Sequence, residues 1–216
     1  MAFEEYDRYE QSELVQKWLR DNGMSIVVGI VIGLVGIFGW QQWNHRQAQN
    51  EANAAQLYQQ VQVAYAAGKP AEAAPLIDQL MKDHASSAYA VFAVSDRARQ
   101  QVEDKQFDQA RAALEWAQGH AGAPALKSLV QLRLAQVALA QGKGDQALAV
   151  LDLLPADGFQ GLAQELRGDA LVKLGRVEDA RKAYQAALSA MAEEAPQHGA
   201  LQMKLDNLAT AGKQGA

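Results

Sequence analysis

Strongly apolar residues are concentrated in one segment near the N-terminus, which reads MSIVVGIVIGLVGIFGWQQW from Met24 to Trp43. No charged side chain occurs within residues 22–44. These 20 residues, if helical, span about 30 Å, the thickness of a bilayer hydrocarbon core, and a helix satisfies its own backbone hydrogen bonds in lipid. Trp18 precedes the segment and Trp40 lies near its end, as is typical of membrane interfaces. The pattern predicts a transmembrane helix over 22–44.

A cleaved signal peptide is the alternative interpretation of an apolar segment at this position. The run exceeds the about 7–15 apolar residues of a signal peptide. Residues 1–21 carry six acids beside three bases, and the following sequence, QQWNHRQ, is bulky and polar. Both features differ from a basic n-region and a small-residue cleavage site, so we expect an uncleaved anchor.

Basic residues are distributed unevenly around the predicted span. Arg8, Lys17 and Arg20 precede it, whereas the next basic residues after it are Arg46 and Lys69. Since the side richer in Lys and Arg stays in the cytoplasm, we expect a short cytoplasmic tail over 1–21, the membrane helix over 22–44, and a domain outside the cytoplasm over 45–216.

Glycines recur inside the predicted span. Gly29, Gly33 and Gly36 lie at spacings that let another membrane helix approach closely. Glycine is also common in membrane helices generally. The glycines therefore predict either a helix–helix contact or a simple tether.

One helical pattern occurs four times beyond the span. In each copy an alanine is followed by apolar or small residues three, four and seven positions further on, which form one face of an α-helix. The copies are Ala73/Leu76/Ile77/Leu80, Ala110/Ala113/Leu114/Ala117, Ala147/Val150/Leu151/Leu154 and Ala180/Ala183/Tyr184/Ala187. The leading alanines of these copies recur at nearly constant intervals along the chain. A period of about 34 residues with two helices per unit is typical of tetratricopeptide-like repeats.

The first helices of the units agree as well. LRLAQVALAQGK (132–143) aligns with ELRGDALVKLGR (165–176), and this alignment pairs Ala135 with Gly168. It also pairs Gly142 with Gly175, and both glycines can adopt a positive φ and end a helix. We therefore expect an all-α fold, with a single N-terminal transmembrane helix followed by a tetratricopeptide-like helical solenoid. Beyond the span, the expected helices are about 47–67, 70–84, 87–104, 107–119, 124–141, 145–153, 159–174, 177–192 and 197–210.

Three parts of this map have special features. The helix from Gln47 can continue directly out of the span, because no Pro or Gly interrupts 44–66. The final helix, HGALQMKLDNLAT, resembles the amphipathic cap that a repeat array needs, and the tail after it is expected to fray. The unit over 87–119 is irregular, since Ser95, Asp96 and Arg97 replace apolar residues of its siblings. That stretch is expected to line a groove or to pack loosely.

The composition of the chain argues against several classes of function. The residues after 21 carry 19 acids and 17 bases, and this near-neutral mixture argues against nucleic-acid binding, which needs a concentrated basic face. The chain has no cysteine, which excludes catalytic thiols, disulfides and thiolate metal sites.

The sequence contains no recognisable catalytic or cofactor-binding constellation. P-loop, dinucleotide-binding and nucleophile-elbow motifs are missing. The histidines are far apart and are predicted to be exposed residues near helix ends rather than metal ligands: His45, His84, His120 and His198. We therefore predict no enzyme, no cofactor and no metal. Solenoids bind partners on their concave face, and the residues expected there, or else at ordinary surface positions, are Gln136, Glu165, Asp169 and Lys173.

The whole chain resembles the YfgM family of ancillary SecYEG translocon subunits of Gram-negative bacteria. The resemblance rests on the entry WLRDNG to the span, its exit GWQQWN, and the repeat LRGDALVKLGRVEDARKAYQAAL. It implies a single-pass inner-membrane protein, anchored in lipid, with its repeats in the periplasm. The implied partners are the SecYEG translocon and a membrane-anchored periplasmic chaperone related to prolyl isomerases. The implied role is handover of translocated proteins to folding factors, without catalytic residues.

Two other functions are compatible with the residues. One is a tetratricopeptide subunit of a periplasmic haem assembly complex, with His45 or His84 as ligand. The other is a regulator of envelope stress signalling that acts through the cytoplasmic tail.

Overall fold

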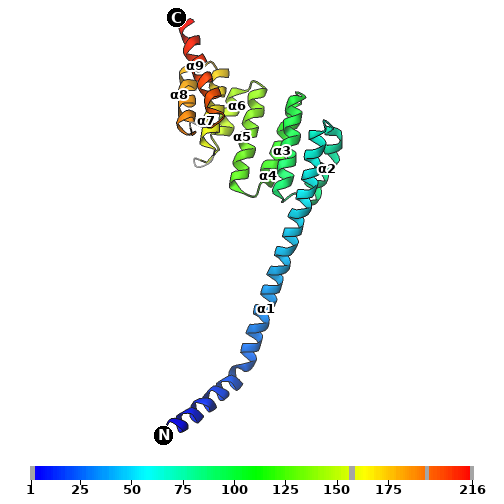
Figure 1. Cartoon of the computed structure of the whole chain (residues 1–216), viewed down its shortest axis with the longest axis vertical. Helices are drawn as coiled ribbons and strands as arrows, with labels where there is room; N and C mark the ends of the chain where they lie inside the picture. Colours follow the sequence, from blue (N-terminus) through cyan, green and yellow to red (C-terminus); the bar gives the residue numbers. More distant parts are fainter. Residues whose placement is uncertain (1–2, 156–158, 193–194, 215–216) are drawn as a thin grey trace. The chain divides into compact units, whose positions relative to one another are not determined.

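The structure is a computed structural model that describes residues 3–155, 159–192 and 195–214, and it is all-α over these ranges (Figure 1). The all-α prediction is thus confirmed. The helices are α1 (Phe3–Ala66), α2 (Pro70–Asp83), α3 (Ala88–Glu103), α4 (Phe107–His120), α5 (Pro124–Ala140), α6 (Gly144–Leu151), α7 (Gln160–Lys173), α8 (Val177–Ser189) and α9 (His198–Gln214).

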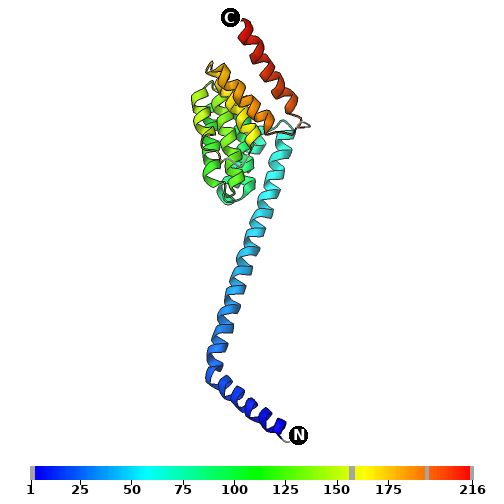
Figure 2. The ribbon, with the colours of Figure 1, turned by 90° about the vertical axis from the view of Figure 1, so that its left-hand side faces the viewer.

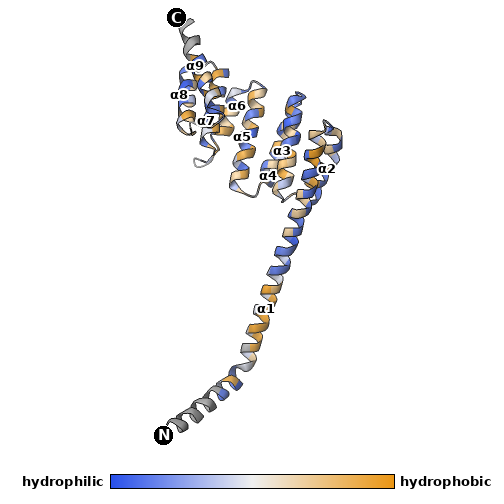
Figure 3. Cartoon of the chain, viewed as in Figure 1, coloured by the Kyte–Doolittle hydropathy of each residue, from blue (hydrophilic) through white to orange (hydrophobic). Residues whose placement is uncertain are grey.

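The chain divides into two compact units, Met1–Asn50 and Glu51–Ala216. The first unit holds the apolar segment of α1 (Figure 3). The described large side chains of this segment are exposed, Phe38 for example by 74%. Within the described residues, α1 is the one helix long and apolar enough to cross a membrane. A fully exposed apolar surface on an otherwise polar chain is stable in lipid but not in water.

The C-terminal end of α1 agrees with the prediction from the sequence, and its N-terminal end differs from it. The helix continues without interruption from the apolar segment to Ala66, as the lack of Pro and Gly over 44–66 predicted. It also extends back to Phe3, through the tail, for which the sequence predicted no helix. Residues 3–22 contain no Pro or Gly, and their acids suit the positive end of a helix dipole.

In the second unit, the helices pack in consecutive pairs (Figure 2). Helix α3 packs against α4, α5 against α6, and α7 against α8. The repeated alanine-centred pattern forms the buried face of the second helix in each pair, as predicted. Its fully or largely buried members are Ala73, Ile77, Leu80, Ala110, Leu114, Ala117, Ala147, Leu151, Ala180, Ala183, Tyr184 and Ala187. The buried residues form a series of clusters along the chain, as expected where each repeat contacts mainly its neighbours.

The turns inside the pairs share one backbone geometry. A residue with positive φ follows each first helix, and the next residue donates its N–H to a carbonyl five positions back. This arrangement satisfies the last carbonyls of a helix. The positive-φ residues are Gly68, Lys105, Gly142 and Gly175. Gly142 and Gly175 thus end their helices as predicted, whereas Lys105 adopts the same conformation with a side chain.

The C-terminal helix caps the array. Leu201 and Leu208 of α9 are buried against the last pair, which confirms the predicted amphipathic cap. The helix extends to Gln214, beyond the expected end at 210. Ala and Lys in that segment are strong helix formers.

The irregular unit is well packed rather than loose. Ser95 is 3% exposed, and its hydroxyl donates to the carbonyl of Val91 at 2.7 Å. Arg97 reaches α2, where its guanidinium lies 2.6 Å from a carboxylate oxygen of Asp78. Loose packing was therefore the wrong alternative, because the polar side chains find partners within the fold. Ser95 and Asp96 line a groove, and Arg97 does not.

Candidate partner-binding groove

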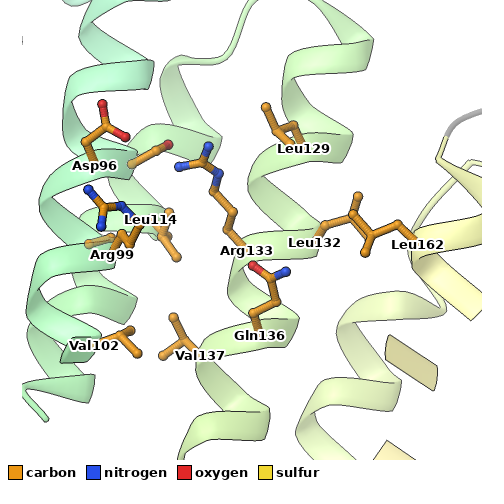
Figure 4. Close-up of a pocket in the computed structure, with 12 residues that line it drawn as sticks. Asp96, Arg99, Val102, Leu114, Leu129, Leu132, Arg133, Gln136, Val137 and Leu162 are labelled. Atoms are coloured by element: carbon orange, nitrogen blue, oxygen red, sulfur yellow. The ribbon is translucent and has the colours of Figure 1, made fainter. Parts of the chain in front are cut away.

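A groove runs between the first helices of neighbouring repeats. Its volume is about 400 Å³. Figure 4 shows its side chains, which come mainly from α3 and α5, with Leu114 contributed by α4 and Leu162 by α7. The lining residues are Ser95, Asp96, Ala98, Arg99, Val102, Leu114, Leu129, Leu132, Arg133, Gln136, Val137 and Leu162. Polar groups therefore share the groove with a mainly apolar surface, which is typical of sites that bind peptides or small molecules.

Asp96 is held by the last turns of α1. Its carboxylate accepts hydrogen bonds from the hydroxyl of Tyr58 at 3.0 Å and from the side-chain amide of Gln62 at 2.6 Å. Burial and the negative charge of Asp96 raise the pKa of Tyr58 to about 12. The phenol therefore remains a donor at physiological pH, and two neutral donors fix the carboxylate in place.

The two arginines of the groove differ in their partners. Arg99 forms an ion pair with Glu103, one turn further along α3, at 2.7 Å. Arg133 is half-buried and reaches from α5 toward α3 (Figure 4). Among the described residues, no carboxylate lies within ion-pair distance of Arg133. Arg133 was not among the residues expected on the concave face. The available signal was its position three residues before Gln136, on the same face of a first helix.

The four residues expected on the concave face have different environments. Gln136 lines the groove. Glu165 and Asp169 instead contact Lys204 of the capping helix α9, whose ammonium group lies 2.8 Å from each carboxylate. Lys173 is exposed at the last position of α7. The fold therefore brings Gln136 together with Arg133, and joins Glu165 and Asp169 in a separate cluster with the C-terminal helix.

This acidic cluster also includes Tyr184, whose hydroxyl donates to Asp169 at 2.7 Å. Burial and the neighbouring Asp169 raise the pKa of Tyr184 well above its ordinary value. Burial alone would lower the pKa of Lys204, but its hydrogen bonds to Asp169 and Glu165 prevail and raise it. The cluster thus holds α7, α8 and α9 together through a charged network.

The span glycines present open surface. A Cβ built on Gly29, Gly33 or Gly36 meets nothing within 4 Å. Among the residues that the structure describes, no contact of this part of α1 therefore explains the small residues.

The described residues contain no group of three or more His, Asp or Glu that could hold a metal ion. His120 stacks on Trp116, with ring centroids 4.0 Å apart, and accordingly has a local structural contact.

Comparison with known proteins places the chain in a family. The model of a tetratricopeptide repeat-like domain matches residues 16–210. Proteins named "Ancillary SecYEG translocon subunit" match over nearly the whole chain. The Haemophilus influenzae protein is 31% identical over 94% of this chain and 99% of its own length. The Aggregatibacter actinomycetemcomitans protein is 32% identical over the same shares, and the Escherichia coli protein 29% identical over 92% and 95%.

No solved structure matches the chain significantly. The matches cover both the apolar segment and the repeats, and they agree with the resemblance found in the span boundaries and the last repeat. The chain therefore belongs to the tetratricopeptide repeat-like family that includes these ancillary SecYEG translocon subunits.

Proposed function

We propose that this protein is a membrane-anchored, non-catalytic scaffold that associates with the SecYEG translocon. The observation that carries the proposal is the full-length match to proteins named as ancillary subunits of that translocon. The apolar part of α1 supports a single-pass anchor in the bacterial inner membrane. The excess of basic residues before it supports a cytoplasmic N-terminus and a periplasmic repeat domain.

The anchor has a thermodynamic role in this proposal. Attachment to the membrane confines the repeat domain to the layer where translocated chains emerge. Confinement raises the effective concentration of a weak binding site without any new contact. A groove of modest affinity, such as the one between α3 and α5, then suffices to hold a partner briefly.

We propose that two surfaces of the protein bind its partners. The open glycine face at Gly29, Gly33 and Gly36 is the surface that we propose meets a helix of the translocon or of a second anchored protein. The repeat domain is proposed to contact a membrane-anchored periplasmic chaperone related to prolyl isomerases and to assist handover of translocated proteins. Gln136, Glu165, Asp169 and Lys173 remain the proposed contact residues on the first helices.

Co-purification tests the association. The full-length chain, affinity-tagged at its C-terminus and expressed at native level, is extracted in a mild detergent and its partners are identified by mass spectrometry. We expect translocon subunits and an anchored chaperone in the eluate. An unrelated single-pass protein with the same tag serves as the control. An eluate with no enrichment over this control would exclude the proposal.

A further inference from the structure

The charges that line the groove balance across its two walls. Asp96 on α3 carries a negative charge and Arg133 on α5 a positive one. The remaining charge of the lining, on Arg99, already pairs with Glu103. A ligand with a net charge of either sign would be attracted by one wall and repelled by the other. The groove therefore suits an uncharged ligand.

Each wall also presents a hydrogen-bonding group that the fold leaves unused. Tyr58 and Gln62 both donate to Oδ2 of Asp96, so Oδ1 accepts no hydrogen bond from the described residues. In the same part of the chain, no hydrogen bond or ion pair joins the guanidinium of Arg133 to another side chain. One wall thus offers an acceptor and the other offers donors. Since both side chains are half-buried, a ligand that pairs with them gains more than it would at an exposed surface.

A peptide group can pair with both walls at once. In the trans form its N–H and C=O point in opposite directions. When an extended segment lies between α3 and α5, one N–H can donate to Asp96 while the C=O of the same peptide group accepts from Arg133. Both hydrogen bonds involve a charged protein group, and such bonds are stronger than those between neutral groups. The two walls therefore match the backbone of a polypeptide rather than one particular side chain.

Apolar residues beside this pair favour an apolar side chain. Val102 of α3 and Val137 of α5 face one another, with Leu114 of α4 beside them (Figure 4). Val137 lies one turn beyond Arg133, about 6 Å along the helix axis. Side chains on one side of an extended segment recur about every 6.6 Å. A segment with a peptide group at Arg133 can therefore direct a neighbouring apolar side chain onto Val137.

We propose that the groove holds an extended, uncharged polypeptide segment with one peptide group between Asp96 and Arg133. An apolar side chain of the segment contacts Val102, Leu114 and Val137. Because the contacts are to backbone and to apolar surface, unfolded segments of many different sequences fit the groove. This inference rests on the proposed function, since it names the class of segment that the scaffold would hold.

Short synthetic peptides test the groove with the full-length protein in a lipid nanodisc. The probe is a glycine- and serine-based peptide with blocked ends and one central leucine. Companion peptides replace the leucine by serine, glutamate or lysine. We expect the leucine peptide to bind about tenfold more tightly than each companion, and the glutamate and lysine peptides to bind equally weakly. Empty nanodiscs measure the partition of each peptide into lipid.

Methylation of single peptide nitrogens tests the backbone contact, because it removes an N–H without adding a charge. Methylation of the leucine nitrogen and of each neighbouring nitrogen in turn should weaken binding about tenfold at one position. Asp96→Asn should abolish this loss, since its amide can present an N–H where the carboxylate presents an oxygen. Asp206→Asn is the matched control, because Asp206 is an exposed acid of α9 and does not line the groove.

Replacement of Arg133 tests the charge balance. Arg133→Gln leaves the charge of Asp96 alone in the groove, so this variant should bind the lysine peptide several-fold more tightly than the glutamate peptide. Arg111→Gln should create no such preference, because Arg111 already pairs with Glu115 and does not line this groove. Circular dichroism melting checks that the variants remain folded.

Five results would overturn the proposal. The leucine peptide fails to bind at about 1 mM, or a charged peptide binds the unmodified chain as tightly as the leucine peptide does. No single methylation weakens binding, or the loss on methylation persists in Asp96→Asn. The last is that Arg133→Gln binds the lysine and glutamate peptides equally.

The two proposals fail separately. Absence of peptide binding with intact co-purification of the translocon would overturn the groove assignment alone. Intact peptide preference without co-purification would overturn the translocon association alone.

Discussion

The ring of Tyr184 in α8 lies directly on Gly168 of α7. A Cβ built on Gly168 falls 2.3 Å from Cε1 of Tyr184, a distance that no relaxed structure accommodates. The same tyrosine donates a hydrogen bond to Asp169, at 2.7 Å, so it cannot move away without losing that bond. The pair therefore fixes how closely α7 and α8 approach.

Gly168→Ala should destabilise the repeat domain by about 2 kcal/mol, since overpacking outweighs the gain in helix propensity. Gly199→Ala in α9 is the control, because a Cβ there meets open space. Urea unfolding followed by circular dichroism measures both. Equal midpoints for the two variants would show that Tyr184 relaxes at little cost.

Replacing Lys105 by glycine should stabilise the fold. It has a φ of 60° in the turn where the other repeats have Gly68, Gly142 and Gly175. A side chain in this conformation costs about 1 kcal/mol. We expect Lys105→Gly to raise the free energy of unfolding by about that amount, and Gly142→Ala to lower it by a similar amount. Opposite shifts of the urea midpoint would confirm the reasoning, and shifts of the same sign would contradict it.

Stability should fall in alkaline solution. The folded state raises the pKa of Tyr184 above 10.0 and that of Lys204 above 10.5, so it binds these protons more tightly than the unfolded chain. Their contribution is complete below about pH 10 and decreases as the pH rises above that value. Urea midpoints measured from about pH 8 to 11.5 should decline at the upper end.

Two variants test whether the cluster of Tyr184 and Lys204 causes this loss of stability at high pH. Tyr184→Phe and Lys204→Met should each have a shallower decline than the unmodified chain, because each removes one of the protons concerned. Arg181→Met, which removes an exposed pair with Glu178, should leave the decline unchanged. An identical slope in all four proteins would exclude the cluster as its cause.

The chain has no cysteine. A single introduced cysteine can therefore report the orientation of the protein in the membrane. Gln16→Cys lies before the span and Gln185→Cys in α8, and both side chains are exposed. In intact spheroplasts a membrane-impermeant thiol reagent should label the second variant and not the first, and lysis should make both reactive. The reverse pattern would place the repeat domain in the cytoplasm.

The glycine face should be sensitive to bulk if it contacts another helix. Gly29→Leu with Gly33→Leu should reduce co-purification of the translocon several-fold, because close helix approach needs small residues. Val31→Leu is the control, since it lies about 200° around the helix from Gly29. Undiminished recovery of the double variant would show that this part of α1 is a tether only.

The groove was only partly predictable from the sequence. The repeat pattern placed Gln136 on a first helix, and the departure at Ser95, Asp96 and Arg97 predicted either a groove or loose packing. The lack of a carboxylate partner for Arg133 could not be predicted, because an ion pair depends on which helices the fold brings together. Glu165 and Asp169 show the same limit, since their partner, Lys204, belongs to the C-terminal helix, far along the chain.

Local periodicity by itself determined the helices, the apolar anchor and the buried faces of the repeats. These follow from residues a few positions apart, such as Ala73 and Ile77, and from glycines whose φ is a local property. Only the tertiary structure decided which charges are paired. Tyr58 reaches Asp96, and Lys204 reaches Asp169, because packing of the helices places distant residues within hydrogen-bond distance.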